Sequence, residues 1–200
     1  MRKGTETKER IIEKALTLFH EKGYNLTSMN DIVEETGVKK GNLYFHYKSK
    51  EELAIRVLKE ALRGYDRFIS SNMKGATPLM KLISMIQGIV AFHVERGNGR
   101  GCIFGNMALE SKGENPALAE YIKSVFTSWE KNISELIGSS IELGEISGID
   151  SPERYARIIL AQLEGAVMLS KVYSEFEPLR ESAEIIIEGL KSKMRRVDVC

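Results

Sequence analysis

Residues 27–53 of the chain, TSMNDIVEETGVKKGNLYFHYKSKEEL, hold the most informative pattern in the sequence. Residues 37–53 contain four lysines, one histidine and three aromatic residues, and no acid occurs between residues 37 and 50. The chain as a whole is almost neutral, with 29 Lys and Arg against 28 Asp and Glu over 200 residues. A concentration of positive charge in a neutral chain predicts a local basic face and argues against a polybasic coat.

The first half of this segment predicts a short helix. Ser28 is a favourable N-cap residue, and Asp31 follows it in capping-box spacing. Ile32 and Val33 are expected to face inward. Gly37 then suits the left-handed conformation that ends many helices.

The second half predicts another short helix after a tight turn at Gly37. Leu43, Phe45 and Tyr47 alternate in the manner of a strand, but the segment is brief and a new helix start follows at Ser49. We therefore expect a helix, with Leu43 and Phe45 holding it against the helix that precedes the segment. Two short helices around a tight turn form a helix-turn-helix, whose second helix can enter the major groove of DNA.

Further helices are predicted on both sides of this segment. An apolar stripe predicts a helix over about residues 7–22, which Gly23 ends. The stripe consists of Ile11, Ile12, Ala15, Leu16 and Phe19. Long amphipathic runs begin at Pro78, Pro116, Pro152 and Pro178, and Thr77, Asn115 and Ser151 precede the first three as caps. Another short helix follows Gly101.

These signals predict an all-α protein of about nine helices. Residues 1–48 are expected to form a compact three-helix domain that contains the helix-turn-helix. Residues 49–200 are expected to form a larger helical domain.

The second short helix carries side chains suited to a nucleic acid. Donors in or beside it are Lys39, Lys40, Asn42, Tyr44, His46, Lys48 and Lys50. Lysines neutralise phosphates, and Gly41 allows a close approach of the backbone to its partner. From composition alone, a solvated basic loop between core helices is an equally good interpretation.

The order of residues in this segment resembles the DNA-binding signature of the TetR family of repressors. The residues that carry the resemblance are Ile32, Gly37, Val38, Gly41, Leu43, Tyr44, His46, Tyr47, Ser49, Lys50 and Leu53. The resemblance extends over residues 7 to about 60, and the remaining helices match the family in number and length. It implies a homodimeric repressor with two N-terminal DNA-binding heads, a near-palindromic operator, and a C-terminal domain for ligand binding and dimerisation.

Carried over by position, the resemblance assigns base contacts to Lys40, Gly41 and Tyr44. Phosphate contacts fall on Ser28, Asn42, His46 and Lys50. Lys39 departs from the family pattern, in which many members carry a small hydroxyl cap at this position. The departure weakens the cap and adds a charge that can meet a phosphate.

The two last helices are candidates for the dimer interface. Residues 155–173, YARIILAQLEGAVMLSKVY, are apolar on most faces, and residues 179–194 carry one apolar stripe. Both patterns also fit the core of a single subunit. With the resemblance, the helices near 152–173 and 178–195 are expected to meet their copies as a four-helix bundle. The small residues Ala161, Gly165 and Ala166 would permit close approach.

The middle helices carry soft and aromatic side chains that are suited to an adaptable apolar cavity. Such a stripe is more often plain core, but the resemblance implies a ligand site. Its candidates are Met85, Phe92, His93, Met107, Phe126 and Trp129. The histidines at positions 20, 46 and 93 form no cluster with metal-ligand spacing, so no metal or other cofactor is expected.

Cys102 is the candidate for a chemical sensor. It follows a glycine-rich turn with Arg96 and Arg100 nearby, and it falls at the first turn of a helix. Both surroundings lower the pKa of a thiol. The pair at 101–102 and the segment GAVMLSKVYSEFEPL at 165–179, which contains the lone Lys171, resemble TetR-type repressors that sense electrophiles or oxidants through one cysteine. A small buried residue at this position is the open alternative, and Cys200 in a charged tail is expected to be incidental.

Other classes of protein are disfavoured. Two distant cysteines fit a reducing cytosol, the charged N-terminus does not read as a signal peptide, and no run is apolar enough to span a membrane, so a cytoplasmic location is expected. No phosphate loop, metal cluster or nucleophile elbow points to an enzyme. Two alternatives stay open. One is a thiol-dependent enzyme that uses Cys102 with His93 as base, and the other is a helical scaffold that binds another protein.

Overall fold

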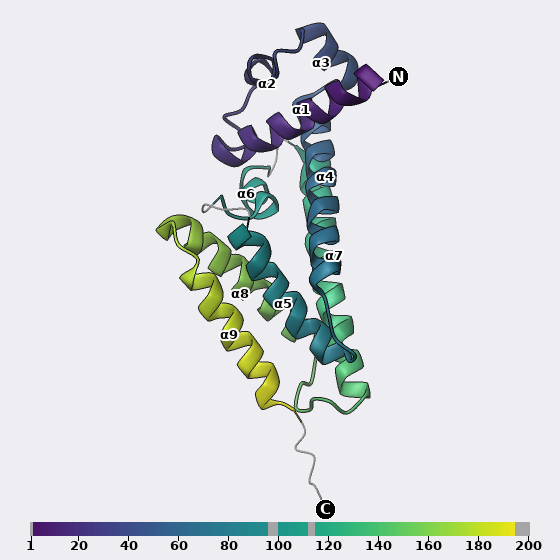
Figure 1. The fold of residues 1–200 in the computed structure, drawn as a ribbon, viewed down its shortest axis with the longest axis vertical. Coiled ribbons are helices and arrows are strands. Elements are labelled where there is room, and N and C mark those ends of the chain that lie inside the picture. Colours follow the sequence, from purple (N-terminus) through teal and green to yellow (C-terminus); the bar gives the residue numbers. More distant parts are fainter. Residues whose placement is uncertain (1, 96–99, 112–114, 195–200) are drawn as a thin grey trace, which may run out of the picture. The chain divides into compact units, whose positions relative to one another are not determined.

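The computed structural model describes residues 2–95, 100–111 and 115–194, apart from the side chains of residues 2–5. Over these ranges the chain is all-α, as predicted, with nine helices (Figure 1). They are α1 (Arg2–Glu21), α2 (Met29–Thr36), α3 (Lys40–His46), α4 (Lys50–Asn72), α5 (Pro78–Glu95), α6 (Ile103–Glu110), α7 (Pro116–Glu142), α8 (Pro152–Tyr173) and α9 (Glu177–Ser192). Among the described helices, none combines the length and the apolar character needed to cross a bilayer.

The helix starts expected at prolines are confirmed. α5, α7 and α8 begin at Pro78, Pro116 and Pro152, and α9 begins one residue before Pro178. Two of the predicted caps form as well. The hydroxyl of Thr77 accepts a hydrogen bond from the N–H of Met80 at 3.3 Å, and the hydroxyl of Ser151 accepts one from the N–H of Arg154 at 3.2 Å.

The start of α7 is capped by a different residue from the one expected. The N–H groups of Ala117 and Leu118 donate to Oε1 of Glu51 in α4 over 3.1 and 3.2 Å. The side-chain oxygen of Asn115, the expected cap, accepts a hydrogen bond from the hydroxyl of Tyr24 at 2.8 Å. The local sequence pattern predicted where α7 begins. It could not predict which residue accepts from the first N–H groups of the helix, because Glu51 lies 66 residues before Ala117.

The chain divides into two compact units. The first unit comprises Met1–Tyr65 and Cys102–Ser124, and the second comprises Asp66–Gly101 and Val125–Cys200. Two of the three divisions fall within α4 and α7, and the third lies between Gly101 and Cys102, just before α6. The predicted boundary between residues 48 and 49 lies inside the first unit, which also contains α6 and the beginning of α7.

In the first unit, α1 packs against α2 and α6, and α2 packs against α3 (Figure 1). Ile11, Ala15 and Phe19 of the predicted stripe are fully buried. Leu43 is fully buried as expected, but the expectation for Phe45 is wrong, because its side chain is 74% exposed. Tyr47, which follows Leu43 by one helical turn, is the aromatic residue that is buried in its place.

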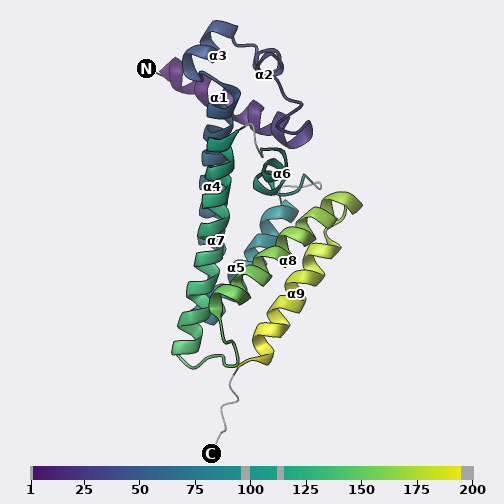
Figure 2. The same cartoon turned by 180° about the vertical axis from the view of Figure 1, so that it is seen from behind.

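In the second unit, α9 packs against both α8 and α5, and both ribbon views show α8 beside α9 (Figure 2). The guanidinium of Arg157 in α8 makes two hydrogen bonds, of 2.8 and 3.3 Å, to the carboxylate of Glu130 in α7. An isolated bridge between Ile146 and Met194 joins the α7–α8 connection to the chain that follows α9. Helix packing therefore stabilises the unit, together with hydrogen bonds such as those between Arg157 and Glu130.

Candidate nucleic-acid interface

The N-terminus of α2 has the capping box that the sequence predicts. The N–H of Asp31 donates to the hydroxyl of Ser28 at 3.1 Å, and the N–H of Ser28 donates to the Asp31 carboxylate at 2.7 Å. Hydrogen bonds from the Ser28 hydroxyl and N–H, with a further one from the Lys22 ammonium, hold the pKa of Asp31 well below its usual range. Gly37 ends the helix in the left-handed conformation, with φ of 65°.

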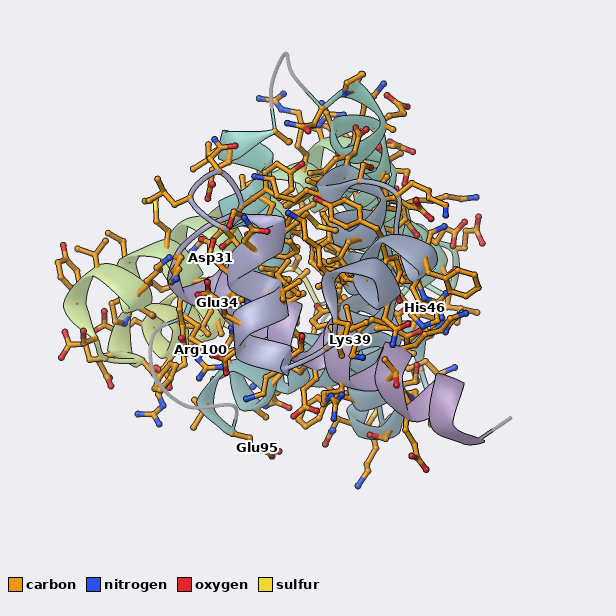
Figure 3. All side chains as sticks on the ribbon, turned by 90° about the horizontal axis from the view of Figure 1, so that it is seen from above. Asp31, Glu34, Lys39, His46, Glu95 and Arg100 are labelled. Carbon is orange, nitrogen blue, oxygen red and sulfur yellow. The ribbon has the colours of Figure 1, made fainter. Side chains whose placement is uncertain are left out.

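The N-terminus of α3 lacks such a cap. Lys39 occupies the N-cap position without a side-chain hydrogen bond to the helix. Figure 3 labels Lys39 and His46, which bracket α3, on one side of the view, and Asp31 and Glu34 of α2 on the other. In this view Asp31 and Glu34 are thus set apart from Lys39 and His46.

A hollow of about 340 Å³ lies where the start of α2 meets α3 and α4. Its lining residues are Ser28, Met29, Asn30, Lys40, Tyr44 and Lys50. Four of the nine predicted DNA-binding residues are brought together here. Met29 and Asn30 were not predicted, although their position as the first residues of a capped helix, where backbone N–H groups face outward, could have identified them.

The ammonium of Lys50 already makes hydrogen bonds within the protein. It donates to the backbone oxygen of Tyr24 at 3.0 Å and to that of Asn25 at 3.4 Å, and it lies 4.4 Å from the centre of the Tyr24 ring. Burial lowers the pKa of Lys50, and the charge of Glu110 acts in the opposite direction. The ammonium has three hydrogens, and the two carbonyls use two of them.

The other predicted DNA-binding residues lie on or beside α3, away from the lining of the hollow. Lys39, Gly41 and Asn42 are exposed. The Lys48 ammonium donates to the backbone oxygen of Tyr44 at 3.3 Å. The ring of His46 lies 5.3 Å from that of Phe45.

Phe45 is a surface residue of α3 that the sequence analysis assigned to the core. It is 74% exposed, and the Lys48 ammonium lies 5.9 Å from its ring centre. Helical spacing contained the signal, because residues 43 and 47 are one turn apart whereas residue 45 falls on the opposite face. A large exposed apolar side chain on this helix is available to a partner.

The candidate ligand residues are distributed over both units. Met85, Phe92, His93, Phe126, Trp129 and Lys171 belong to the second unit, whereas Cys102 and Met107 belong to the first. Within the second unit, the ring of Phe92 lies 5.4 Å from that of Phe68, and the ring of Phe126 lies 5.2 Å from that of Trp129. Met107 is fully buried, and Lys171 is exposed in the last turn of α8.

Cys102 is the N-cap of α6. Its sulfur accepts a hydrogen bond from the N–H of Gly105 at 3.5 Å, and its side chain is partly exposed. Arg100 is exposed, whereas Arg96 and Cys200 lie outside the described residues. Among the part of the chain that the structure describes, His, Cys, Asp and Glu form no group of three that could hold a metal ion.

Comparison with known proteins assigns the chain to a family. Residues 11–57 match the model for "Bacterial regulatory proteins, tetR family", and residues 78–186, more than half of the chain, match the model for "Tetracyclin repressor-like, C-terminal domain". The chain belongs to the TetR family. It is therefore a DNA-binding transcriptional regulator, and the helix-turn-helix of α2 and α3 falls within the first match.

Individual TetR relatives agree with this assignment. The chain is 28% identical over 186 residues to the HTH-type transcriptional repressor DhaR of Mycobacterium sp. (strain GP1), covering 93% of both chains. It is 32% identical to a TetR transcriptional regulator from Chloroflexus aurantiacus, with a TM-score of 0.87 over 98% of this chain and 99% of the other. Reduced E. coli NemR, 16% identical with a TM-score of 0.78 over 96% of this chain and 100% of the other, shares the fold.

Proposed function

We propose that the protein is a homodimeric repressor that binds a near-palindromic operator and leaves it when a small molecule or a reactive electrophile or oxidant is present. The observation that carries the DNA-binding part is the hollow at the start of α2. There Lys40, Tyr44 and Lys50 surround the N-terminus of a capped helix. Helix N-termini and lysines both favour a phosphate, and the tyrosine adds a donor that can reach a base edge or the backbone.

Gly41 supports a close approach of DNA to α3. A Cβ atom at this position would meet no atom within 4 Å beyond its chain neighbours and the adjacent backbone of α3. Within a helix, alanine is about 1 kcal/mol more favourable than glycine. Packing within the protein therefore does not require glycine at this exposed helical position. A base or a phosphate of DNA that lies directly against the backbone of α3 would require it.

The dimer part of the proposal rests on the outer face of α8. Ile158, Met168 and Val172 are 53%, 56% and 65% exposed, although all three are apolar. They share helical spacing with Ala161, which is exposed, and with Gly165, where an added Cβ would meet nothing. Ala166 is buried, so Ala161 and Gly165 are the small residues available to a second copy. An apolar stripe with small residues at its centre fits a helix of the partner in a four-helix bundle.

The test is DNA binding by the purified chain to the region upstream of its own gene, measured over a range of salt concentrations. With about four charged phosphate contacts in each head, the slope of log affinity against log salt is expected to be roughly −7. A Met168→Glu variant places a charge in the proposed interface. It is expected to sediment as a monomer and to lose operator binding, whereas a variant that stays dimeric would contradict the α8 interface.

The signal is proposed to act through the second unit or through Cys102. Apolar and aromatic residues such as Phe92 and Trp129 are suited to an adaptable ligand, and the Cys102 thiol caps α6 while remaining partly exposed. Operator release by N-ethylmaleimide or hypochlorite should occur in the wild type and be lost in Cys102→Ser. Equal release in both proteins would exclude Cys102 as the sensor.

A further inference from the structure

The loop between α1 and α2, residues 22–28, is held by a residue far outside the helix-turn-helix. The N–H of Asn25 donates to Oε2 of Glu110 at 2.7 Å, and the side-chain amide of Asn25 donates to the backbone oxygen of Glu110 at 3.2 Å. The two residues are 85 positions apart, and Glu110 is the last residue of α6. Each residue thus uses both its backbone and its side chain, so the contact fixes position and orientation together.

A second tie to the same loop comes from Asn115, just before α7. The hydroxyl of Tyr24 donates to the side-chain oxygen of Asn115 at 2.8 Å, and the tyrosine is only 1% exposed. Burial, with a contribution from the charge of Glu51, raises the pKa of Tyr24 to about 12. The hydroxyl therefore stays protonated as a donor at neutral pH.

The loop itself is built to receive Glu110. Gly23 has φ of +85°, and a Cβ atom there would lie 2.8 Å from Oε1 of Glu110, so a side chain at this position would be strained and would displace the Glu110 carboxylate. The hydroxyl of Thr27 donates to the backbone oxygen of Gly23 at 2.7 Å. The Lys50 ammonium takes the carbonyls of Tyr24 and Asn25. The carbonyls of Gly23, Tyr24 and Asn25 are thereby paired within the first unit.

We infer that Glu110 and Asn115 are positioning residues for DNA binding, because they fix the loop that ends at Ser28 and so place the N-terminus of α2. The inference rests on the proposed function, in which this N-terminus meets a phosphate. Hydrogen bonds from backbone N–H groups to a phosphate depend steeply on distance and angle. If the loop were released from α6, the N-terminus of α2 would no longer be held in one position. Its contact with the DNA phosphate would weaken, although Glu110 itself does not touch the DNA.

The experiment compares Glu110→Ala with Glu110→Gln in the full-length protein, on the operator selected from a random DNA library by the wild type. Glutamine keeps an acceptor for the N–H of Asn25, whereas alanine removes it. We expect Glu110→Ala to bind about ten-fold more weakly and Glu110→Gln to stay within about three-fold of the wild type. Glu120→Ala serves as the control, because it removes a glutamate of the same unit that is 72% exposed and paired with Lys123.

A change of the DNA separates positioning from a general loss of structure. The operator phosphate that meets α2 is first located by ethylation interference with the wild type and is then replaced by a neutral methylphosphonate. This replacement should weaken binding by the wild type and by Glu110→Gln, but have little further effect on Glu110→Ala. Asn25→Ala, which removes only the amide arm of the contact, should give an intermediate result if Glu110→Ala does not fold.

The outcomes distinguish this inference from the proposed function. A wild-type protein that binds no DNA would overturn the proposed function. If the wild type binds but Glu110→Ala binds equally well, or loses as much as the wild type on the methylphosphonate operator, the positioning role is wrong. A Glu110→Gln variant as weak as Glu110→Ala would contradict the hydrogen-bond basis of the inference.

Discussion

The helices α2 and α3 are neighbours of similar length, and their residues are explained in different ways. In α2, Ser28 and Asp31 cap the start, Gly37 ends the helix, and Asp31 and Glu35 pair with lysines of the first unit. In α3, the N-cap residue Lys39 makes no side-chain hydrogen bond to the helix. Gly41 has open space around it, and Phe45 is largely exposed.

The difference separates residues that stabilise the protein itself from residues that are explained by binding to a partner. Contacts inside the protein account for the capping, charge pairing and termination of α2. In α3, by contrast, Lys39 provides no side-chain cap, Gly41 lowers the helix propensity, and Phe45 leaves most of an apolar ring in water. Local rules that fail in one place while neighbouring rules hold are typical of a functional surface.

The largest expected effect is a difference in stability between substitutions at two residues of α3 that are two positions apart. Leu43→Ala should lower the free energy of unfolding of the first unit by about 2–5 kcal/mol, because it empties a fully buried site. Phe45→Ala should change it by less than about 0.5 kcal/mol, because the ring is already in water. Hydrogen exchange of the slowest amides measures both values. A large loss of stability in Phe45→Ala would show that this ring is part of the core after all.

The next effect concerns the cap of α2. Ser28→Ala should destabilise the helix by about 1 kcal/mol, because the N–H of Asp31 loses its acceptor. Operator affinity should fall as well, since the same hydroxyl lines the hollow. Ser28→Asp replaces a hydroxyl that donates to the Asp31 carboxylate with a second carboxylate, so it should lose stability as well as affinity. Retained affinity in Ser28→Asp would argue against a phosphate at this position.

A substitution at Gly41 should move stability and binding in opposite directions. Gly41→Ala is expected to stabilise the first unit by up to about 1 kcal/mol, because alanine is the better helix former and its methyl group meets open space. The same methyl group should weaken operator binding by about ten-fold through overlap with closely approaching DNA. Thermal unfolding and a binding titration on one preparation test the pair, and unchanged affinity would remove the argument for close approach.

The smallest effect concerns Lys39. Lys39→Ser supplies the hydroxyl cap that α3 lacks and should add a few tenths of a kcal/mol to stability. It also removes one charge from each head, so the salt slope of operator binding should become less steep by about 2 for the dimer. Lys131→Ser, on the exposed surface of α7, is the matched control and should leave the slope unchanged. An unaltered slope in Lys39→Ser would show that this lysine meets no phosphate.

Much of the fold could be predicted because its signals are local. Ser28, Asp31 and Gly37 define α2 within ten residues, and the prolines identify the starts of α5, α7 and α8. The prediction failed where the partner is distant in sequence. Glu51, not Asn115, caps α7.

For the candidate site, residue type and order predicted DNA contacts by Ser28, Lys40, Tyr44 and Lys50. The structure brings the four residues to one hollow, and their contacts with DNA stay a prediction. The carbonyls that occupy Lys50 could not be predicted, because the loop conformation depends on Glu110 and Asn115 from far along the chain. Phe45 was missed for a different reason. Its alternation with Leu43 and Tyr47 suggested shared burial, although the helix that was itself predicted turns residue 45 outward.

The first unit is built from two segments that are distant in sequence, and this has a consequence for protein engineering. A chimaeric regulator would join the N-terminal part of one chain to the C-terminal part of another. A junction placed within α4, after Glu51, would leave the loop at Asn25 facing a foreign α6 and would leave Glu51 facing a foreign α7. A transplanted DNA-binding head of this protein would therefore need to bring Cys102–Ser124 with it, as a second graft into the recipient chain.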